Sequence, residues 1–109
     1  MTISEKNNND SKLIAECNDA HRRSMTGCTV TKGVAGLAFV GDIFKKVVTY
    51  SDFNEDNDPH GEHDFGSFEI FAHKIFWKID YYDENLEKWG DPLDEYCQRV
   101  LTIMLADEY

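Results

Sequence analysis

The stretch that decides the fold is "FGSFEIFAHKIFWKIDYYD", residues 65–83. Apolar and aromatic residues alternate with polar ones along most of it, as they do in strands that bury one face. The pattern predicts a hairpin with strands at 65–71 and 74–82 and a turn near Ala72 and His73. The face expected to form the core carries Gly66, Phe68, Ile70, Ile75, Trp77, Ile79 and Tyr81.

The residues before this hairpin predict two helices and a short strand. Apolar or small residues recur at helical spacing over 11–24 and again over 39–50. Between them, "CTVTKG" (28–33) alternates and is rich in β-branched residues, which is typical of a strand.

The residues after the hairpin predict a third helix over 92–106. Asp91 suits an N-cap, Pro92 suits the first helical turn, and apolar residues follow at helical spacing. The order of elements predicts a flexible leader at 1–10 and a single α+β domain at 11–109. In that domain about three helices pack on a small, mainly antiparallel sheet.

Nearly all the excess negative charge lies in one third of the chain. The formal net charge is −10, and residues 52–87 hold eleven acids against two bases, Lys74 and Lys78. Such a segment repels phosphate backbones, so we expect no direct binding to nucleic acid. It attracts basic protein surfaces and cations instead.

The composition also predicts a cellular location. No run of 18 apolar residues is present, so no membrane span is expected. The first ten residues lack the basic start and apolar core of a secretory signal. Cys17, Cys28 and Cys97 lack a C-x-x-C spacing, so neither a disulfide framework nor a thiolate zinc site is expected. These features predict a cytoplasmic protein.

Acidic residues meet at the open end of the predicted hairpin. The segment "NEDNDPHGEHDFG" (54–66) enters there, and residues 80–87 leave from it. Like charges held close together cost stability unless a partner or a cation neutralises them. We therefore expect a surface for a basic protein partner, built from Asp56, Asp58, Glu62, Asp64, Asp80, Tyr82, Asp83 and Glu84. Nearby aromatic residues such as Trp89 suit the role of interface anchors.

Other interpretations of the 54–66 segment stay open. It could bind a divalent metal through His60, His63 and Asp64. It could belong to a hydrolytic enzyme with His63 as general base, although no complete catalytic motif accompanies it. It could also be a solvated turn, because Asn, Asp, Pro and Gly all favour turns. The partner-binding surface, which needs no catalysis and no cofactor, is the first hypothesis, and the metal-dependent protein or enzyme is the alternative.

Three blocks carry a resemblance to known sequences. They are "FNEDNDPHGEHDFGSFEI" (53–70), "IFWKIDYYD" (75–83) and "RVLTIMLADEY" (99–109). The blocks resemble an uncharacterised bacterial family described as a domain of unknown function. The resemblance does not by itself indicate which activity or cofactor the protein has. It favours a role on a mobile element, as an inhibitor that mimics nucleic acid and blocks a nucleic-acid-binding complex.

Overall fold

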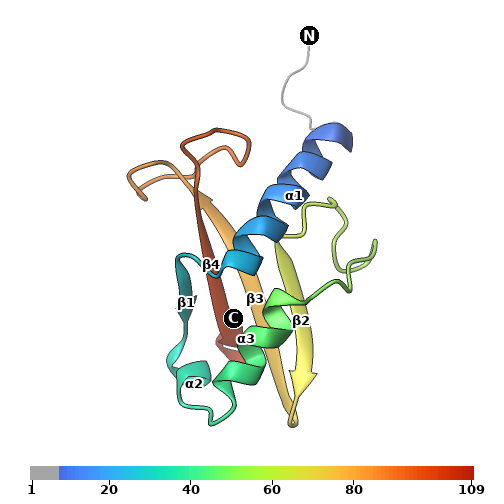
Figure 1. Ribbon diagram of the computed structural model, residues 1–109, viewed down its shortest axis with the longest axis vertical. Helices are drawn as coiled ribbons and strands as arrows, with labels where there is room; N and C mark the ends of the chain where they lie inside the picture. The colour runs from blue at the N-terminus through green and yellow to red at the C-terminus, as the bar shows by residue number, and fades with distance from the viewer. Residues whose placement is uncertain (1–7) are drawn as a thin grey trace.

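The computed structural model describes residues 8–109 and consists of a four-stranded sheet with helices on one face (Figure 1). The helices are α1 (Asn8–Ser24), α2 (Lys32–Ala35) and α3 (Val40–Val48), and the strands are β1 (Cys28–Val30), β2 (Phe65–Ile70), β3 (His73–Tyr82) and β4 (Gln98–Leu105). A 3-10 turn, η1 (Ala106–Glu108), follows β4. The predicted leader, 1–10, falls mostly on residues 1–7, which lie outside the described residues, and residues 8–10 begin α1.

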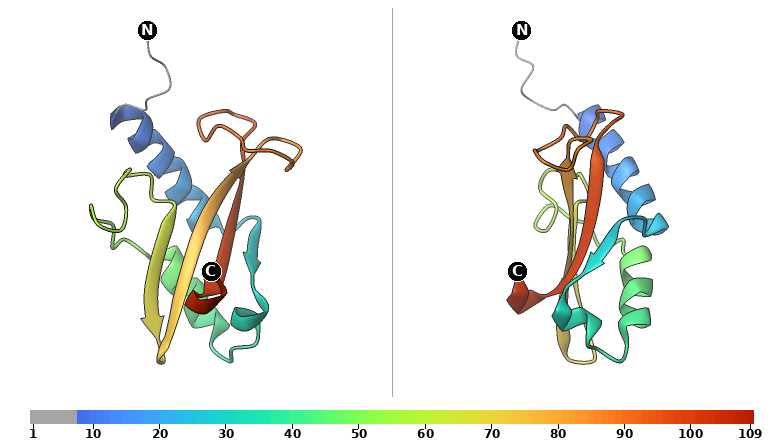
Figure 2. Two further views of the ribbon diagram at one scale, coloured as in Figure 1. Left: turned by 180° about the vertical axis from the view of Figure 1, so that it is seen from behind. Right: turned by 90° about the vertical axis from the view of Figure 1, so that its left-hand side faces the viewer.

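The strand order of the sheet is β1-β4-β3-β2. β1 runs parallel to β4, and the other two neighbouring pairs are antiparallel. Figure 2 shows α1 and α3 on one face of the sheet and η1 on the other side. These elements confirm the predicted α+β class and the helices expected at 11–24 and 39–50. None of the described helices is long and apolar enough to cross a membrane.

The predicted hairpin is present, with its turn one residue earlier than expected. β2 and β3 pair as far as Ile70 opposite His73, so Phe71 and Ala72 form the turn. Their φ angles are positive, 48° and 66°, as a two-residue turn of type I′ requires. The predicted core face is confirmed, because the side chains that β3 buries are Ile75, Trp77 and Ile79.

The helix predicted at 92–106 is wrong. Residues Gln98–Leu105 form β4, which lies between β3 and β1 in the sheet. Helical spacing predicted a buried stripe of Leu93, Tyr96, Cys97, Val100, Leu101 and Met104, whereas the strand turns the alternating residues Leu101, Ile103 and Leu105 toward the core beside β3. Partners on both sides of β4 satisfy its backbone, and local spacing carries no information about such distant partners.

The residues expected to start that helix belong to a loop. The Asp91 carboxylate accepts a hydrogen bond from the backbone N–H of Leu93 at 2.9 Å, which closes a turn and does not cap a helix. Leu93 and Tyr96, which helical spacing placed on a buried stripe, are 43% and 58% exposed. The C-terminal helical element is therefore only the short turn η1.

The buried side chain of Arg22 links α1 to the end of α3 through hydrogen bonds. Its side chain is 1% exposed, and its guanidinium donates to the backbone oxygens of Val47 and Tyr50 at 2.9 Å each. The last carbonyls of a helix have no partner within that helix. Arg22 donates to one of them, that of Val47, which also accepts from the Tyr50 N–H at 3.3 Å, and to the carbonyl of Tyr50 just beyond the helix. Its Nη1 also lies 3.0 Å from Asp19. Arg22 thereby fixes the chain where it leaves α3.

Candidate functional site

Two loops lie at the end of the sheet opposite the β2–β3 turn (Figure 1). The 51–64 loop leads into β2, and the 83–97 loop joins β3 to β4. Asp64, Asp80, Tyr82 and Trp89 line one pocket of about 340 Å³ there. Of the acids expected to meet at this end, the pocket brings Asp64 and Asp80 together.

A buried polar cluster holds these loops to α1. The Asn18 amide, fully buried, donates to the backbone oxygen of Glu62 at 2.9 Å and to the hydroxyl of Tyr81 at 2.8 Å. Burial raises the pKa of Tyr81, so the phenol keeps its proton, and it donates to the Glu62 carboxylate at 3.3 Å. Arg99 on β4 donates to the side-chain oxygen of Asn18 at 2.6 Å. The cluster fixes the 51–64 loop through Glu62, and the 83–97 loop through a bond from Arg99 to the backbone oxygen of Pro92.

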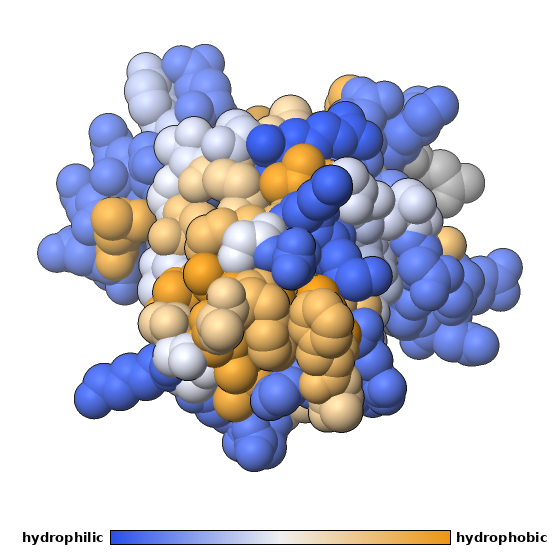
Figure 3. All heavy atoms as spheres, turned by 60° about the horizontal axis from the view of Figure 1, so that its bottom comes forward, coloured by the Kyte–Doolittle hydropathy of each residue, from blue (hydrophilic) through white to orange (hydrophobic). Residues whose placement is uncertain are grey.

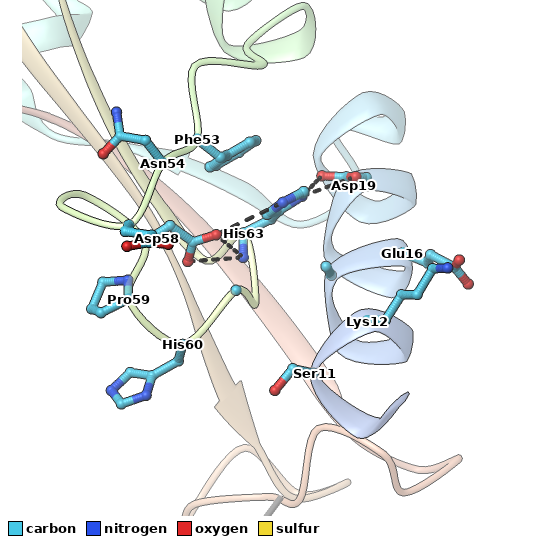
Figure 4. Close-up of a pocket in the computed structure, with 13 residues that line it drawn as sticks. Ser11, Lys12, Glu16, Asp19, Phe53, Asn54, Asp58, Pro59, His60 and His63 are labelled. Carbon is cyan, nitrogen blue, oxygen red and sulfur yellow. Dashed lines mark hydrogen bonds and ion pairs between the residues drawn. The ribbon is translucent and has the colours of Figure 1, made fainter. Parts of the chain in front are cut away.

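A pocket of about 640 Å³ lies between α1 and the 51–64 loop (Figure 4). Its acidic side chains come from both elements, Glu16 and Asp19 from α1 and Glu55 and Asp58 from the loop. Among the described residues that line it, Lys12 is the one lysine or arginine. The pocket therefore favours a cationic or neutral ligand over an anionic one.

His63 lies between two carboxylates at this pocket. Its Nδ1 is 3.0 and 3.1 Å from the carboxylate oxygens of Asp19, and its Nε2 is 3.7 Å from Oδ2 of Asp58 (Figure 4). Its ring stacks on Phe53 with 3.8 Å between centroids. Its φ angle is +57°, a left-handed conformation that non-glycine residues adopt at a cost. The imidazole is thus held in a defined orientation.

Two of the expected metal ligands, His60 and His63, do not point toward one another in the structure. Figure 4 shows the side chain of His60 pointing away from His63. Within the part of the chain that the structure describes, no group of three or more His, Cys, Asp or Glu side chains is arranged to hold a metal ion. The donor pair that the fold does bring together is His63 Nε2 and Asp58 Oδ2.

The 83–97 loop exposes apolar and aromatic side chains among acids. Of the seven large apolar side chains exposed among the described residues, four belong to this loop: Leu86, Trp89, Leu93 and Tyr96, at 57%, 68%, 43% and 58% exposure. The same loop carries six acids, Asp83, Glu84, Glu87, Asp91, Asp94 and Glu95, and one base, Lys88. Large exposed apolar groups rimmed by polar ones mark interaction surfaces.

Internal hydrogen bonds give the 83–97 loop a defined shape. The Asp83 carboxylate accepts from the backbone N–H groups of Asn85 and Glu87, and these bonds hold its pKa below its usual range. Trp89 forms a β-bridge with Tyr82. Arg99 donates to the backbone oxygen of the fully buried Pro92 at 2.8 Å. The loop therefore presents its exposed side chains from an ordered backbone.

The residues expected to bind a partner fall into two groups. Glu62 is buried and the side chain of Asp58 is 6% exposed, and both carboxylates accept hydrogen bonds inside the fold. The carboxylate of Asp80 pairs with Lys78 at 2.8 Å. Asp64, Tyr82 and Asp83 are partly exposed, and Asp56 and Glu84 are exposed. The accessible acids, and not the whole expected set, can meet a protein partner.

Replacing Asp64 with asparagine is expected to stabilise the fold at neutral pH. Burial, with the nearby carboxylate of Glu62, raises the pKa of Asp64. Its ionised form is therefore less favourable in the folded than in the unfolded chain, so the wild type loses stability as pH rises through the folded pKa. Urea unfolding at several pH values should show a gain of about 1 kcal/mol or less at neutral pH. The gain should vanish at acid pH, where the carboxyl is protonated in both states.

A pH-independent gain, or a loss at neutral pH, would contradict this account of Asp64. Asp56→Asn is the matched control, because Asp56 is exposed in the same loop. It should change stability by no more than about 0.5 kcal/mol.

Two sets of site residues could not be recognised from the sequence alone. Asp19 lies on the first helix, far from His63 in sequence, and local spacing gave no reason to join them. Leu86, Leu93 and Tyr96 escaped for a different reason, because the predicted helix at 92–106 buried two of them. The composition of 83–97, with acids and large apolar residues interleaved over a stretch that contains Gly90 and Pro92, could have indicated an exposed loop.

The chain was compared with curated proteins, with solved structures and with models of protein families. Neither the curated proteins nor the solved structures contain a match to the chain. Residues 30–108 match the family "Protein of unknown function (DUF3768)". The match includes β4, both loops and His63, and it begins after α1, which carries Asp19 and Asn18. Because it spans most of the sequence, the chain belongs to the family of proteins of unknown function DUF3768.

Proposed function

We propose that the protein is an acidic binding module that engages a basic, nucleic-acid-binding protein through its 83–97 loop. The observation that carries the proposal is the group of four exposed apolar side chains among six acids in that loop. In this proposal the protein acts in the cytoplasm as an inhibitor. Its carboxylates occupy the basic surface that would otherwise hold phosphates.

The side chains of the loop suit the two contributions to protein recognition, apolar anchoring and electrostatic steering. Trp89 and Tyr96 are side chains of the types that dominate interface energies. The surrounding carboxylates steer a basic surface toward the loop and disfavour acidic ones. Because internal hydrogen bonds already order the loop, little conformational entropy remains to be lost on binding.

Capture of a partner tests this function. The chain is immobilised and exposed to a lysate of cells that encode it, and captured proteins are identified and then purified for binding measurements. The expected partner is basic and binds nucleic acid, and nucleic acid competes with the chain for it. Trp89→Ala should weaken the affinity for that partner by at least about tenfold, which is about 1.4 kcal/mol.

One matched variant controls for a general loss of exposed hydrophobic surface. Phe71 is 66% exposed and packs its ring against Phe39 at the far end of the molecule, where Figure 3 shows a concentration of apolar side chains. Phe71→Ala should leave the affinity unchanged. An equal loss of affinity in Phe71→Ala and Trp89→Ala would contradict a specific contact between the 83–97 loop and the partner.

A second candidate function is binding of a divalent cation by His63 and Asp58. It is favoured by the contact between Asp19 and Nδ1 of His63, because a metal-binding histidine commonly donates its other ring N–H to a carboxylate. With Nδ1 at Asp19, the other ring nitrogen of His63, Nε2, faces the carboxylate of Asp58. Water molecules would have to complete the coordination shell.

Melting of chelator-treated protein with and without calcium, magnesium, manganese or zinc tests the cation site. One ion should stabilise the wild type by about 2.7 kcal/mol when its concentration is a hundredfold above Kd. His63→Gln should abolish this stabilisation, and His60→Gln should retain it. Stabilisation that survives in His63→Gln, or no stabilisation by any of these ions, would exclude the proposed pair.

A further inference from the structure

The fold brings two cysteines to one pocket although they lie far apart in the sequence. Cys17 on α1 and Cys97, just before β4, both line a pocket of about 510 Å³. The segments that carry them are in contact, because Arg99, two residues after Cys97, donates to the side-chain oxygen of Asn18, the residue after Cys17, at 2.6 Å. Both thiols are free, and Cys17 is exposed. Cys28 begins β1 and does not line this pocket.

His21 supplies a base to the same pocket. It follows Cys17 by one helical turn on α1 and lines the pocket with both cysteines. Its Nε2 is shielded from solvent and has no hydrogen-bond partner among the residues that the structure describes. Burial and the guanidinium of Arg99 lower the pKa of His21, so its imidazole is neutral at pH 7. A neutral imidazole with a free nitrogen can accept a thiol proton.

We propose that Cys17 and Cys97 are a redox pair that forms a reversible disulfide with low-molecular-weight disulfides as the oxidant. The exposed Cys17 reacts first, because access governs the first attack and because burial raises the pKa of Cys97. Its thiolate attacks one sulfur of the oxidant, forms a mixed disulfide and releases one thiolate.

Cys97 then completes the exchange. It gives its proton to His21 and attacks the sulfur of Cys17, which releases the second small thiolate. The two protein thiols lose two electrons and two protons, and the oxidant becomes two small thiols. Cys97 ends the 83–97 loop, and disulfide-bonded residues have Cα atoms about 4.4–6.8 Å apart. The bond therefore fixes one end of that loop to α1.

The disulfide is expected to affect partner binding. This expectation rests on the proposed function. The exposed anchors Trp89 and Tyr96 lie on the loop that the bond restrains at Cys97. A covalent bond at Cys97 adds a restraint next to Tyr96, beyond the hydrogen bonds that already order the loop, and so changes how these side chains are presented. Oxidation should therefore change the affinity for the basic partner, and reduction should restore it.

The experiment uses the full chain with Cys28→Ser, so that only the two pocket cysteines can react. The protein is treated with oxidised glutathione, quenched by alkylation at intervals, and analysed by intact mass and by peptide mapping without reduction. The expected product is a monomer with a Cys17–Cys97 bond. It should form at least about tenfold faster in the folded chain than in urea, because the fold raises the effective concentration of the thiols. His21→Gln should slow the second step in the folded chain only.

Three outcomes would overturn the redox pair: stable glutathione adducts on both cysteines, disulfide-linked dimers, or equal rates in the folded and unfolded chains. None of these readouts involves the partner, so they leave the proposed function standing. An intramolecular bond that leaves partner affinity unchanged would remove only the effect on binding. Loss of the proposed function would instead appear as wild-type affinity in a reduced Trp89→Ala chain.

Discussion

Replacing Arg22 with methionine is expected to destabilise the protein by about 3–5 kcal/mol, as measured by urea unfolding. Methionine keeps much of the apolar stem of arginine but none of its donors. The backbone oxygens of Val47 and Tyr50 then remain inside the fold without the guanidinium that now serves them. A loss of this size is a large part of the stability of an ordinary domain.

The rings around Arg22 add to this effect. The guanidinium carbon lies 5.5 Å from the ring centre of Phe53 and 5.0 Å from that of Trp77, so the charge also interacts with two aromatic faces. Loss of the guanidinium loosens the chain that leads from α3 to Phe53, whose ring stacks on His63. Arg22→Met should therefore also expose His63 to faster modification by diethyl pyrocarbonate.

Arg23→Met is the control for Arg22. Arg23 is the next residue on α1 and is exposed. Its replacement should change the free energy of unfolding by no more than about 0.5 kcal/mol. If Arg22→Met cost less than about 1 kcal/mol, the bonds to the end of α3 would not stabilise the fold as described.

Gly66→Ala is the second substitution with a large expected effect, a loss of about 1–3 kcal/mol. Gly66 lies opposite Trp77 in the β2–β3 pair. A Cβ atom at this position would come within 2.4 Å of Nε1 of Trp77. Because the indole is fully buried between the sheet and the helices, it cannot swing aside. Overpacking therefore shifts the strands or the ring, and thermal unfolding measures the cost.

A second substitution distinguishes overpacking from a loss of backbone freedom. Trp77→Phe makes room beside residue 66, so Gly66→Ala should cost less in that background than in the wild type. Gly41→Ala in α3 is the control, because a Cβ there meets no atom within 4 Å. It should stabilise the helix by roughly 0.5–1 kcal/mol. Equal costs of Gly66→Ala in both backgrounds would contradict the clash with Trp77.

The sequence predicted the hairpin correctly for a clear reason. From Ile75 to Asp80, buried and less buried positions alternate, and a period of two is the local signature of a strand with one covered face. The turn was placed one residue late because Phe71 and Ala72 are not typical of a turn with positive φ angles. Their conformation comes from the pairing of the strands they join.

The end of the chain shows the limit of local patterns. Residues from Val100 to Met104 satisfy helical spacing and strand alternation at once, and the preceding Asp91-Pro92 favoured the helix. The choice of strand depends on β1 and β3, which offer free backbone partners on both sides of β4. The exposure of Leu93 and Tyr96 follows from this choice, so the clearest feature of the candidate surface was hidden by the wrong helix.

The acidic site was predictable only in part. Charge and hairpin geometry correctly placed Asp64 near Asp80 and Tyr82. They gave no indication that Asp58 and Glu62 turn inward to hydrogen-bond within the fold, nor that Asp19 comes from α1 to hold His63. These contacts join segments distant in sequence and depend on how α1 crosses the sheet.

The most direct test of the account is the affinity of the purified partner for the chain at low and high salt. A variant with Glu84→Gln, Glu87→Gln and Glu95→Gln removes three exposed charges of the 83–97 loop, and Glu55→Gln with Asp56→Asn removes two from the 51–64 loop. Wild-type affinity should fall as salt rises, and the first variant should bind at least about tenfold more weakly at low salt with a shallower salt dependence. The second variant should stay close to the wild type. Unchanged affinity and salt dependence in the first variant would contradict the claim that the 83–97 loop binds a basic partner.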